Sequence, residues 1–267
     1  MLVRAIEFTP KPADAEAMAR GDATYPLSLP WLRAFARLDL DAPVTIFVGD
    51  NGSGKTTLLN AIAAAAGLPT IGRDASSAAR SLPLRLIRSV PLKRGCHFRA
   101  DQVGEFLAAT SRAMAELDTI TEEFADIEGD WGRQRAQGVA RAERAALSSR
   151  YGEAPQSHSH GEIYLRLLRE RITGKGLYVL DEPEAPLSPT NQIALIQLLL
   201  DAVAERDCQF VIATHSPILM ACPGATLIDC GSTPPQPIAW EDTEHVSLTR
   251  AFLNNPQAFL RHLDHTP

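Results

Sequence analysis

The sequence has few of the features that mark secreted, thiolate-metal or membrane-spanning proteins. Its four cysteines, Cys96, Cys208, Cys222 and Cys230, form no CxxC pair and no other metal-ligand spacing. We therefore expect reduced thiols that are buried as small hydrophobic residues. The longest apolar stretches, such as 193–200, are interrupted by polar residues and are too short to cross a bilayer. The N-terminus lacks a signal-peptide pattern, so we expect a cytoplasmic protein without membrane insertion.

An excess of positive charge is also absent. The formal net charge is −6 over 267 residues, which disfavours a strongly basic nucleic-acid binder, although a local basic patch stays possible. Hydrophobic residues make up 45% and charged residues 22% of the chain, as in ordinary globular proteins. The length suits one large domain, or one domain with a subdomain.

Short apolar runs alternate with helical patterns along most of the chain. We predict strands at Leu2–Phe8, Val44–Val48, Leu177–Leu180, Cys208–Ala213 and Ala225–Ile228. We predict helices at 56–66, 163–172, 193–203 and after Asn255–Pro256, with Ser188 as an N-cap before Pro189. Such a rhythm predicts an α/β fold with a mostly parallel sheet and flanking helices on both faces.

A change of character near residue 102 predicts an inserted helical subdomain. Apolar residues recur at helical spacing from Val103 to Leu117, and an acidic and then an arginine-rich stretch follow. These charges are solvated helix faces or a partner-docking surface. We predict one domain over 1–267, made of a first core part (1–101), the helical subdomain (102–155), a second core part (156–240) and a C-terminal helical tail (241–267).

The tail carries five large apolar residues, which are Phe252, Leu253, Phe259, Leu260 and Leu263. We expect the tail helix to dock on the core, with a partner-binding helix as the alternative.

Residues 49–56, with the sequence GDNGSGKT, fit the P-loop pattern GxxxxGK[ST] and lie between a predicted strand and a predicted helix. Gly52 and Gly54 let the backbone turn its N–H groups inward around an anion, and the helix N-terminus adds its positive dipole end. We expect Lys55 to reach the β- and γ-phosphates of ATP and the Thr56 hydroxyl to bind Mg²⁺. The candidate nucleotide-binding residues here are Gly49, Asp50, Asn51, Gly52, Ser53, Gly54, Lys55, Thr56 and Thr57.

Two adjacent acids end the strand 177–180. Asp181 is expected to face the Mg²⁺, and Glu182 to orient and deprotonate a water beside the γ-phosphate. Adjacent buried carboxylates are costly without a cation or a shared proton, which favours this interpretation over a plain surface pair. His215 follows the next buried strand at its carboxyl end, where open α/β sheets bind ligands, and is expected to contact the γ-phosphate. These motifs together predict a P-loop NTPase with Glu182, His215 and Lys55 as catalytic residues.

Residues 156–162, with the sequence QSHSHGE, precede a predicted helix and resemble the ABC signature in its SGGE form, with His160 in place of the first glycine. The chain as a whole resembles the small, stand-alone ABC-type ATPases often labelled AAA-family. The resemblance rests on SLP, GDNGSGKTTLLNAIA, FRAD, QSHSHGE, LYVLDEPEAPLSP, ATHSPIL and EDTEHVSLTRAFLNNPQAFLRHL. It implies an ABC-ATPase-like core, ATP and Mg²⁺ as ligands, and a homodimer in which Ser159, Gly161 and Glu162 cap the partner's γ-phosphate.

Three positions depart from the transporter pattern or stay open. Ser188 stands where ABC transporter ATPases have the Asp of the D-loop. The communication between the two active sites that is usual in those ATPases is therefore in doubt. The Mg²⁺-contacting Q-loop residue is assigned to Gln102, with Asp101 as the alternative. Tyr25 either stacks on adenine as the aromatic A-loop residue or, in the interpretation we prefer, has a packing role.

Three function classes compete. The first is a self-contained ATPase whose dimerisation does work on an unknown protein partner. The second is the ATP-binding subunit of a membrane ABC transporter. The third is a nucleic-acid-processing ATPase of the recombination or SMC-like type, which the negative charge and the lack of long heptad arms disfavour. Nucleic acid is therefore the least expected partner.

Overall fold

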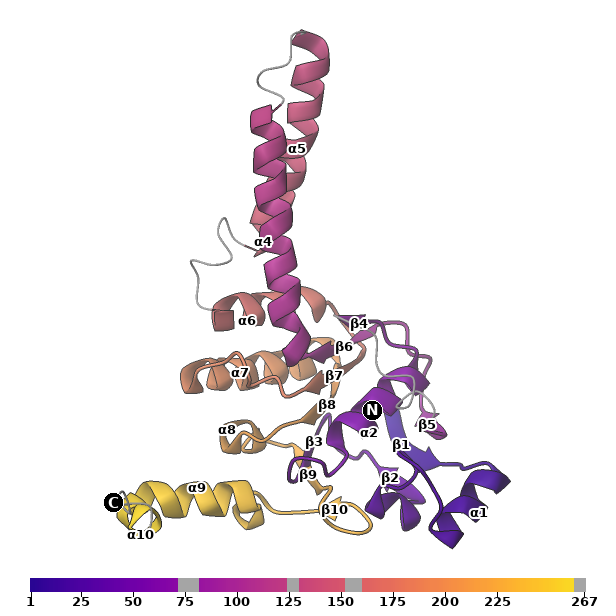
Figure 1. Cartoon of the computed structure of the whole chain (residues 1–267). Helices are drawn as coiled ribbons and strands as arrows, with labels where there is room; N and C mark the ends of the chain where they lie inside the picture. Colours follow the sequence, from indigo (N-terminus) through magenta and orange to yellow (C-terminus); the bar gives the residue numbers. More distant parts are fainter. Residues whose placement is uncertain (72–81, 124–129, 152–159, 262–267) are drawn as a thin grey trace.

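A computed structural model describes residues 1–71, 82–123, 130–151 and 160–261 (Figure 1). Its centre is a seven-stranded sheet with the order β10-β9-β3-β8-β7-β6-β4. The strands are β3 (Val44–Val48), β4 (Thr70–Ile71), β6 (Gly95–Arg99), β7 (Leu177–Asp181), β8 (Gln209–Ala213), β9 (Thr226–Asp229) and β10 (Gln236–Pro237). Neighbouring strands are parallel except β10, which pairs antiparallel with β9. The predicted mostly parallel sheet is confirmed.

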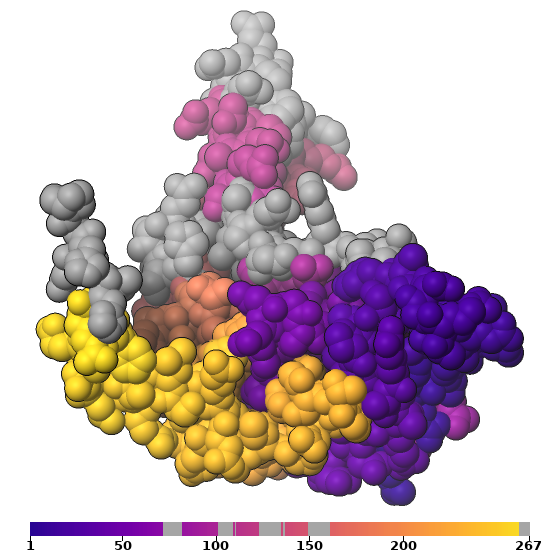
Figure 2. Space-filling view, turned by 60° about the horizontal axis from the view of Figure 1, so that its bottom comes forward, coloured from indigo at the N-terminus to yellow at the C-terminus, as the bar shows by residue number. Residues whose placement is uncertain are grey.

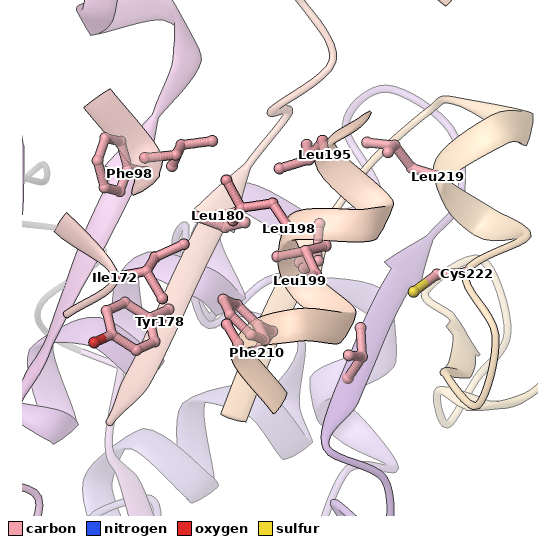
Figure 3. Packing of buried hydrophobic residues seen from close by; sticks show 14 of the residues in the cluster. Phe98, Ile172, Tyr178, Leu180, Leu195, Leu198, Leu199, Phe210, Leu219 and Cys222 are labelled. Carbon is pink, nitrogen blue, oxygen red and sulfur yellow. The ribbon is translucent and has the colours of Figure 1, made fainter. Parts of the chain in front are cut away.

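Both faces of this sheet are covered by helices. Successive side chains of each strand point to opposite sides, so each strand contributes residues to two cores. On β7, Tyr178 and Leu180 face the layer formed by α6 (His160–Arg171), α7 (Pro189–Arg206) and α8 (Pro217–Met220). Figure 3 shows this packing around Leu198, Leu199 and Phe210. Leu177 and Val179 join the other core, with Leu58 and Ile62 of α2 (Lys55–Ala66). Continuous apolar strands are thus explained by helices on both sides.

A second, small antiparallel sheet covers α2 on its far side. It has the order β2-β1-β5 and consists of β1 (Val3–Phe8), β2 (Arg37–Asp39) and β5 (Leu84–Arg88). Its apolar residues share a core with α2 and with Trp31 of the short η1 helix (Pro30–Arg33), which follows α1 (Pro12–Arg20). The sequence predicted only the first of these strands, because β2 and β5 are short and alternate with charged residues.

Two long helices project from the sheet as a hairpin (Figures 1 and 2). They are α4 (Ala100–Glu123) and α5 (Asp130–Tyr151). Arg144 Nε donates to Asp118 Oδ1 at 2.8 Å, and Gln137 donates to the Thr121 carbonyl at 3.1 Å. The hairpin begins at Ala100, just before the range 102–155 proposed for the helical subdomain, and otherwise lies within it, and the subdomain boundaries at 102 and 155 stay a prediction.

The tail does not dock on the core as expected. After η2 (Trp240–Asp242) come α9 (Glu244–Asn254) and α10 (Pro256–Leu260), which extend along one edge of the molecule (Figure 2, yellow). Phe252, Phe259 and Leu260 are exposed, and Leu253 is 71% exposed, while Phe252 and Phe259 pack on each other at 5.7 Å. Leu263 lies outside the described residues. The docking prediction is wrong because only the first turn of α9, through Val246, packs against the core.

Most of the remaining local predictions are confirmed. Strand β3 has the predicted bounds, Ser188 caps α7 by accepting from the Asn191 N–H at 3.3 Å, and Pro189 begins that helix. The four cysteines are free and buried. Burial raises the pKa of the Cys96 thiol to about 12, as expected for an unreactive thiol.

Candidate active site

The P-loop joins β3 to α2 in a conformation that needs glycine. Gly54 has a φ of +91°, and a Cβ added there would lie 3.0 Å from side-chain atoms of Leu29 and Trp31. Trp31 is itself buried, and its indole N–H donates to the Ser53 carbonyl at 2.7 Å. The loop is therefore braced from outside by the η1 segment, whose contact with the P-loop the sequence analysis did not identify.

Lys55 begins α2, and its side chain reaches back into this loop. Its side chain is 5% exposed, and its Nζ donates to the carbonyls of Gly49 at 2.7 Å and Asp50 at 2.9 Å. Burial lowers the pKa of Lys55, while the nearby acids Glu182 and Asp181 oppose this shift. A partly desolvated ammonium group that is held by neutral carbonyls is well placed to exchange them for phosphate oxygens.

Thr56 and Asp181 lie in contact at the edge of the sheet. The Thr56 hydroxyl donates to Asp181 Oδ1 at 3.2 Å, and Asp181 ends the buried strand β7. Hydroxyl and carboxylate oxygens are the ligands that Mg²⁺ prefers, together with phosphates and water. No cluster of three or more His, Cys, Asp or Glu side chains occurs among the residues that the structure places. The side chains of Gln102 and Asp101 lie outside the described part, so the structure gives no geometry for the Q-loop prediction.

Glu182 and His215 stand beside this pair. Glu182 has a φ of 48°, which is rare for a residue other than glycine and recurs at functional sites. Its N–H donates to the Ala213 carbonyl at 2.9 Å, which ties it to the end of β8. His215 Nε2 lies 3.7 Å from Glu182 Oε1. Burial, followed by the charge of Lys55, lowers the pKa of His215, so the ring is neutral at neutral pH.

These residues surround a cavity of about 380 Å³. The cavity is lined by Tyr25, Leu29, Asn51, Gly52, Gly54, Lys55, Thr56, Thr57, Asn60, Arg99 and Glu182. Most P-loop residues and Glu182 thus line one cavity. Asp181 and His215 lie at its edge, where Asp181 contacts Thr56 and His215 lies beside Glu182.

The signature residues lie elsewhere on the chain. Gly161 is buried in the first turn of α6, where an added Cβ would approach Asn191 Nδ2 at 2.8 Å and the Pro186 carbonyl at 3.0 Å. Glu162 follows in the same turn and is exposed, while Ser159 lies outside the described residues. Neither Gly161 nor Glu162 is among the described residues that line the cavity.

Comparisons with known proteins agree with this geometry. A family model described as "AAA domain" matches residues 31–91, and one described as "AAA domain, putative AbiEii toxin, Type IV TA system" matches residues 162–221. The lipoprotein-releasing system ATP-binding protein LolD of Chromohalobacter salexigens is 29% identical over 180 residues, which are 65% of this chain and 72% of that protein. The vitamin B12 import ATP-binding protein BtuD of Vibrio parahaemolyticus is 27% identical over 189 residues, 66% of this chain and 69% of its own.

The chain is an ATPase that is similar to P-loop ATPases of the ABC type. ATP is its nucleotide, and hydrolysis of ATP is its reaction. Among solved structures, an ATP-binding cassette of an ABC transporter in its ADP conformation has a TM-score of 0.49 and 17% identity, with 99% of this chain and all of that one covered. Among the helices of the described segments, none has the length and apolar character that a membrane span needs.

Four residues that line the ATPase cavity, Tyr25, Leu29, Asn60 and Arg99, were not assigned to it from the sequence. Tyr25 is 57% exposed, and its hydroxyl is hydrogen-bonded to the Thr57 hydroxyl, so the packing role that we preferred is wrong. Asn60 lies one turn into α2. Arg99 ends β6 in register with Asp181, and its place at the carboxyl end of a strand was a signal that the FRAD motif already offered.

Two further residues of the ATPase hold His215. The buried Glu184 carboxylate accepts from the His215 backbone N–H at 2.7 Å, and burial raises the pKa of Glu184. His245 Nε2 lies 2.9 Å from His215 Nδ1. The motifs DEPE and EDTEH contain these two residues, but the spacing of 30 residues between the histidines gives no sign that the rings meet.

Proposed function

We propose that this ATPase works as a homodimer that holds two ATP molecules between the P-loop of one chain and the signature of the other, and that the ATP cycle drives work on a protein partner. The observation that carries the proposal is the separation of Gly161 and Glu162 from the cavity lined by their own P-loop. A signature that does not face its own P-loop can serve the nucleotide of a second copy, and two-fold symmetry then produces two equal sites.

Within each site, the P-loop residues 49–57 would bind the phosphates, with Lys55 on the β- and γ-phosphates. Thr56 and Asp181 would hold Mg²⁺, which their oxygen atoms suit, with Gln102 as a further contact. When bound, the metal neutralises phosphate charge. Ser159, Gly161 and Glu162 of the second chain would complete the site at the γ-phosphate, because a helix N-terminus and a serine hydroxyl both bind anions.

The chemical step would use Glu182 and His215. The Glu182 carboxylate is half exposed beside the cavity and would orient a water and take its proton. His215 would contact the γ-phosphate from the end of β8, since its Nε2 points toward Glu182. Glu184 supports this arrangement by fixing the His215 backbone.

Light scattering after size exclusion tests the dimer with Glu182→Gln, which is expected to bind ATP and hydrolyse it slowly. With ATP and Mg²⁺ this variant should elute at twice the 29.0 kDa of one chain, and without nucleotide at 29.0 kDa. The double variant Lys55→Ala, Glu182→Gln is the matched control and should stay monomeric, because its P-loop has lost the phosphate-binding charge. A mass of one chain in both cases, with ATP binding verified, would contradict the nucleotide-dependent dimer.

The relatives LolD and BtuD, ATP-binding proteins of a lipoprotein-releasing system and of vitamin B12 import, favour a second candidate, an ATP-binding subunit of a membrane transporter. The ATP-trapped Glu182→Gln variant distinguishes the two candidates when it is used to capture partners from separate membrane and soluble fractions. Recovery of one integral membrane protein in stoichiometric amount would support the transporter subunit. Recovery of a soluble protein would support the self-contained ATPase.

A further inference from the structure

The first turn of α9 places a second histidine against the histidine of the active site. His245 Nε2 and His215 Nδ1 are 2.9 Å apart, and the two ring centroids are 5.0 Å apart. The other nitrogen of His215, Nε2, is buried, has no hydrogen-bond partner in the described ranges, and lies 3.7 Å from Glu182 Oε1. The His215 ring thus has His245 as its partner at Nδ1 and faces the edge of the cavity with Nε2.

The position of His245 is fixed by the segment around it. The Trp240 indole N–H donates to the Pro217 carbonyl at 3.0 Å, two residues after His215. The Thr243 hydroxyl donates to the Trp240 carbonyl at 2.8 Å, and Thr243 is itself buried. Val246 packs in the core beside these residues. Helix α9, whose residues 247–254 are exposed, is therefore anchored at the turn that carries His245.

The contact between the two rings decides which nitrogen of His215 carries hydrogen. In a 2.9 Å contact between two imidazole nitrogens, one must donate and the other must accept. If His215 donated from Nδ1, its neutral ring would have a bare lone pair on Nε2. That lone pair would repel the oxygens of the Glu182 carboxylate and of a phosphate. If His245 donates, Nε2 of His215 carries the hydrogen and can donate to such oxygens.

We infer that His245 is a positioning residue for ATP hydrolysis, which donates from Nε2 to His215 Nδ1 and so keeps the hydrogen of His215 on Nε2, facing Glu182 and the γ-phosphate. The inference rests on the proposed role of His215 at the γ-phosphate. The lowered pKa of His215, caused first by burial, agrees with a neutral ring in which one nitrogen accepts. The separation of 3.7 Å between Nε2 and Glu182 Oε1 leaves this hydrogen available to a phosphate oxygen or a water.

Nitrogen-15 NMR of histidine-labelled protein tests the tautomer directly, and substitution of each of the two residues in turn assigns their signals among the seven histidines. At a pH at which both rings are neutral, His215 should show a bare Nδ1 and a protonated Nε2 in the native chain. In His245→Leu, which cannot donate, His215 should populate both tautomers. A protonated Nδ1 on His215 in the native chain would overturn the inference.

Steady-state ATPase kinetics provides the second readout. His245→Leu should lower kcat about tenfold with less than a threefold change in KM for ATP, as for other residues that orient a reacting group. His245→Gln, whose side-chain amide can donate to Nδ1, should recover most of the lost rate. Leu248→Ala, an exposed position on the same helix, is the control and should leave kcat unchanged.

The outcomes separate this inference from the proposed function. If His215→Ala keeps the native rate, the proposed role of His215 is wrong. If His215→Ala is inactive while His245→Leu keeps the native rate, His215 acts and the positioning role of His245 is wrong. A His245→Gln enzyme as slow as His245→Leu would also contradict a role that depends on a donated hydrogen bond.

Discussion

At the residue scale, the site depends on a few side chains, and at least one of them is held in position by an unfavourable backbone conformation. Glu182 is held at a φ of 48° with its N–H bonded to Ala213, so its carboxylate is directed by the ends of β7 and β8 and not by its own preference. Backbone strain of this kind persists where the surrounding structure over-determines it. We expect this backbone conformation to direct the Glu182 carboxylate toward the cavity.

Glu182→Gln should therefore keep ATP binding and lose hydrolysis by about 10²-fold or more, because an amide cannot take the proton of the attacking water. Titration calorimetry would measure binding, and phosphate release would measure turnover. Glu205→Gln, at an exposed position on α7, is the matched control and should keep the native rate. Near-normal turnover of Glu182→Gln would remove Glu182 from the role of general base.

The sequence predicted the residues whose chemistry depends on local spacing. The P-loop, the acids Asp181 and Glu182 at the end of β7 and His215 just after β8 are read from a strand and the few residues after it, and the structure brings them together. Tyr25, Arg99 and His245 were missed or misread because each reaches the site from a distant segment. Only tertiary packing, such as the anchoring of Trp240 on Pro217, brings such residues to the site.

At the scale of elements, strand β6, which lies between β7 and the edge strand β4, carries an unusual buried residue. His97 is 0% exposed, and both of its ring nitrogens lack a hydrogen-bond partner within the described part of the chain. Burial, with a contribution from Arg99, lowers the pKa of His97 from 6.5 to about 4. The folded state thus holds this ring neutral where an unfolded chain would protonate it.

The sign of the resulting pH dependence follows from proton uptake. Between pH 6.5 and pH 4 the unfolded state binds more protons at His97 than the folded state, so the free energy of unfolding falls as the pH falls through this window. The loss should reach about 3 kcal/mol at pH 4. Denaturant unfolding at pH 7 and pH 4 would measure it, with His97→Leu as the comparison. Equal acid sensitivity of both proteins would contradict the buried neutral ring.

Strands that are buried on both faces of the sheet were predicted correctly. Predictions failed for elements whose burial depends on contacts with distant segments of the chain. Strands β3, β7 and β8 are continuous apolar runs in the middle of a parallel sheet, and each was predicted within one residue at either end. In the small sheet, β1 pairs with β2 and with β5, which are distant segments of the chain, and the short strands β2 and β5 carry no local signal. Helix α9 shows the opposite error, since its apolar residues Phe252 and Leu253 predicted burial and are exposed.

At the scale of the whole molecule, the proposal makes each active site the joint product of two chains. The cavity lined by the P-loop belongs to one chain, and Gly161 and Glu162 of that chain do not line it. In a symmetric dimer, a Lys55→Ala chain paired with a Ser159→Arg chain contains one site with both defects and one site with neither. Each variant alone should be nearly inactive, because all its sites carry a defect.

Mixing these two variants is the measurement that tests the shared site most directly. With random exchange about half of the dimers are mixed, each with one intact site, so an equal mixture should recover roughly a quarter of the native ATPase activity. Strict coupling between the two sites would lower that fraction, and Ser188 at the D-loop position leaves the coupling open. Subunit exchange is verified by capture of one tagged variant with the other. Activity well above that of either variant alone is the predicted result, and a mixture of exchanged subunits that stays as inactive as its components would contradict independent sites shared between two chains.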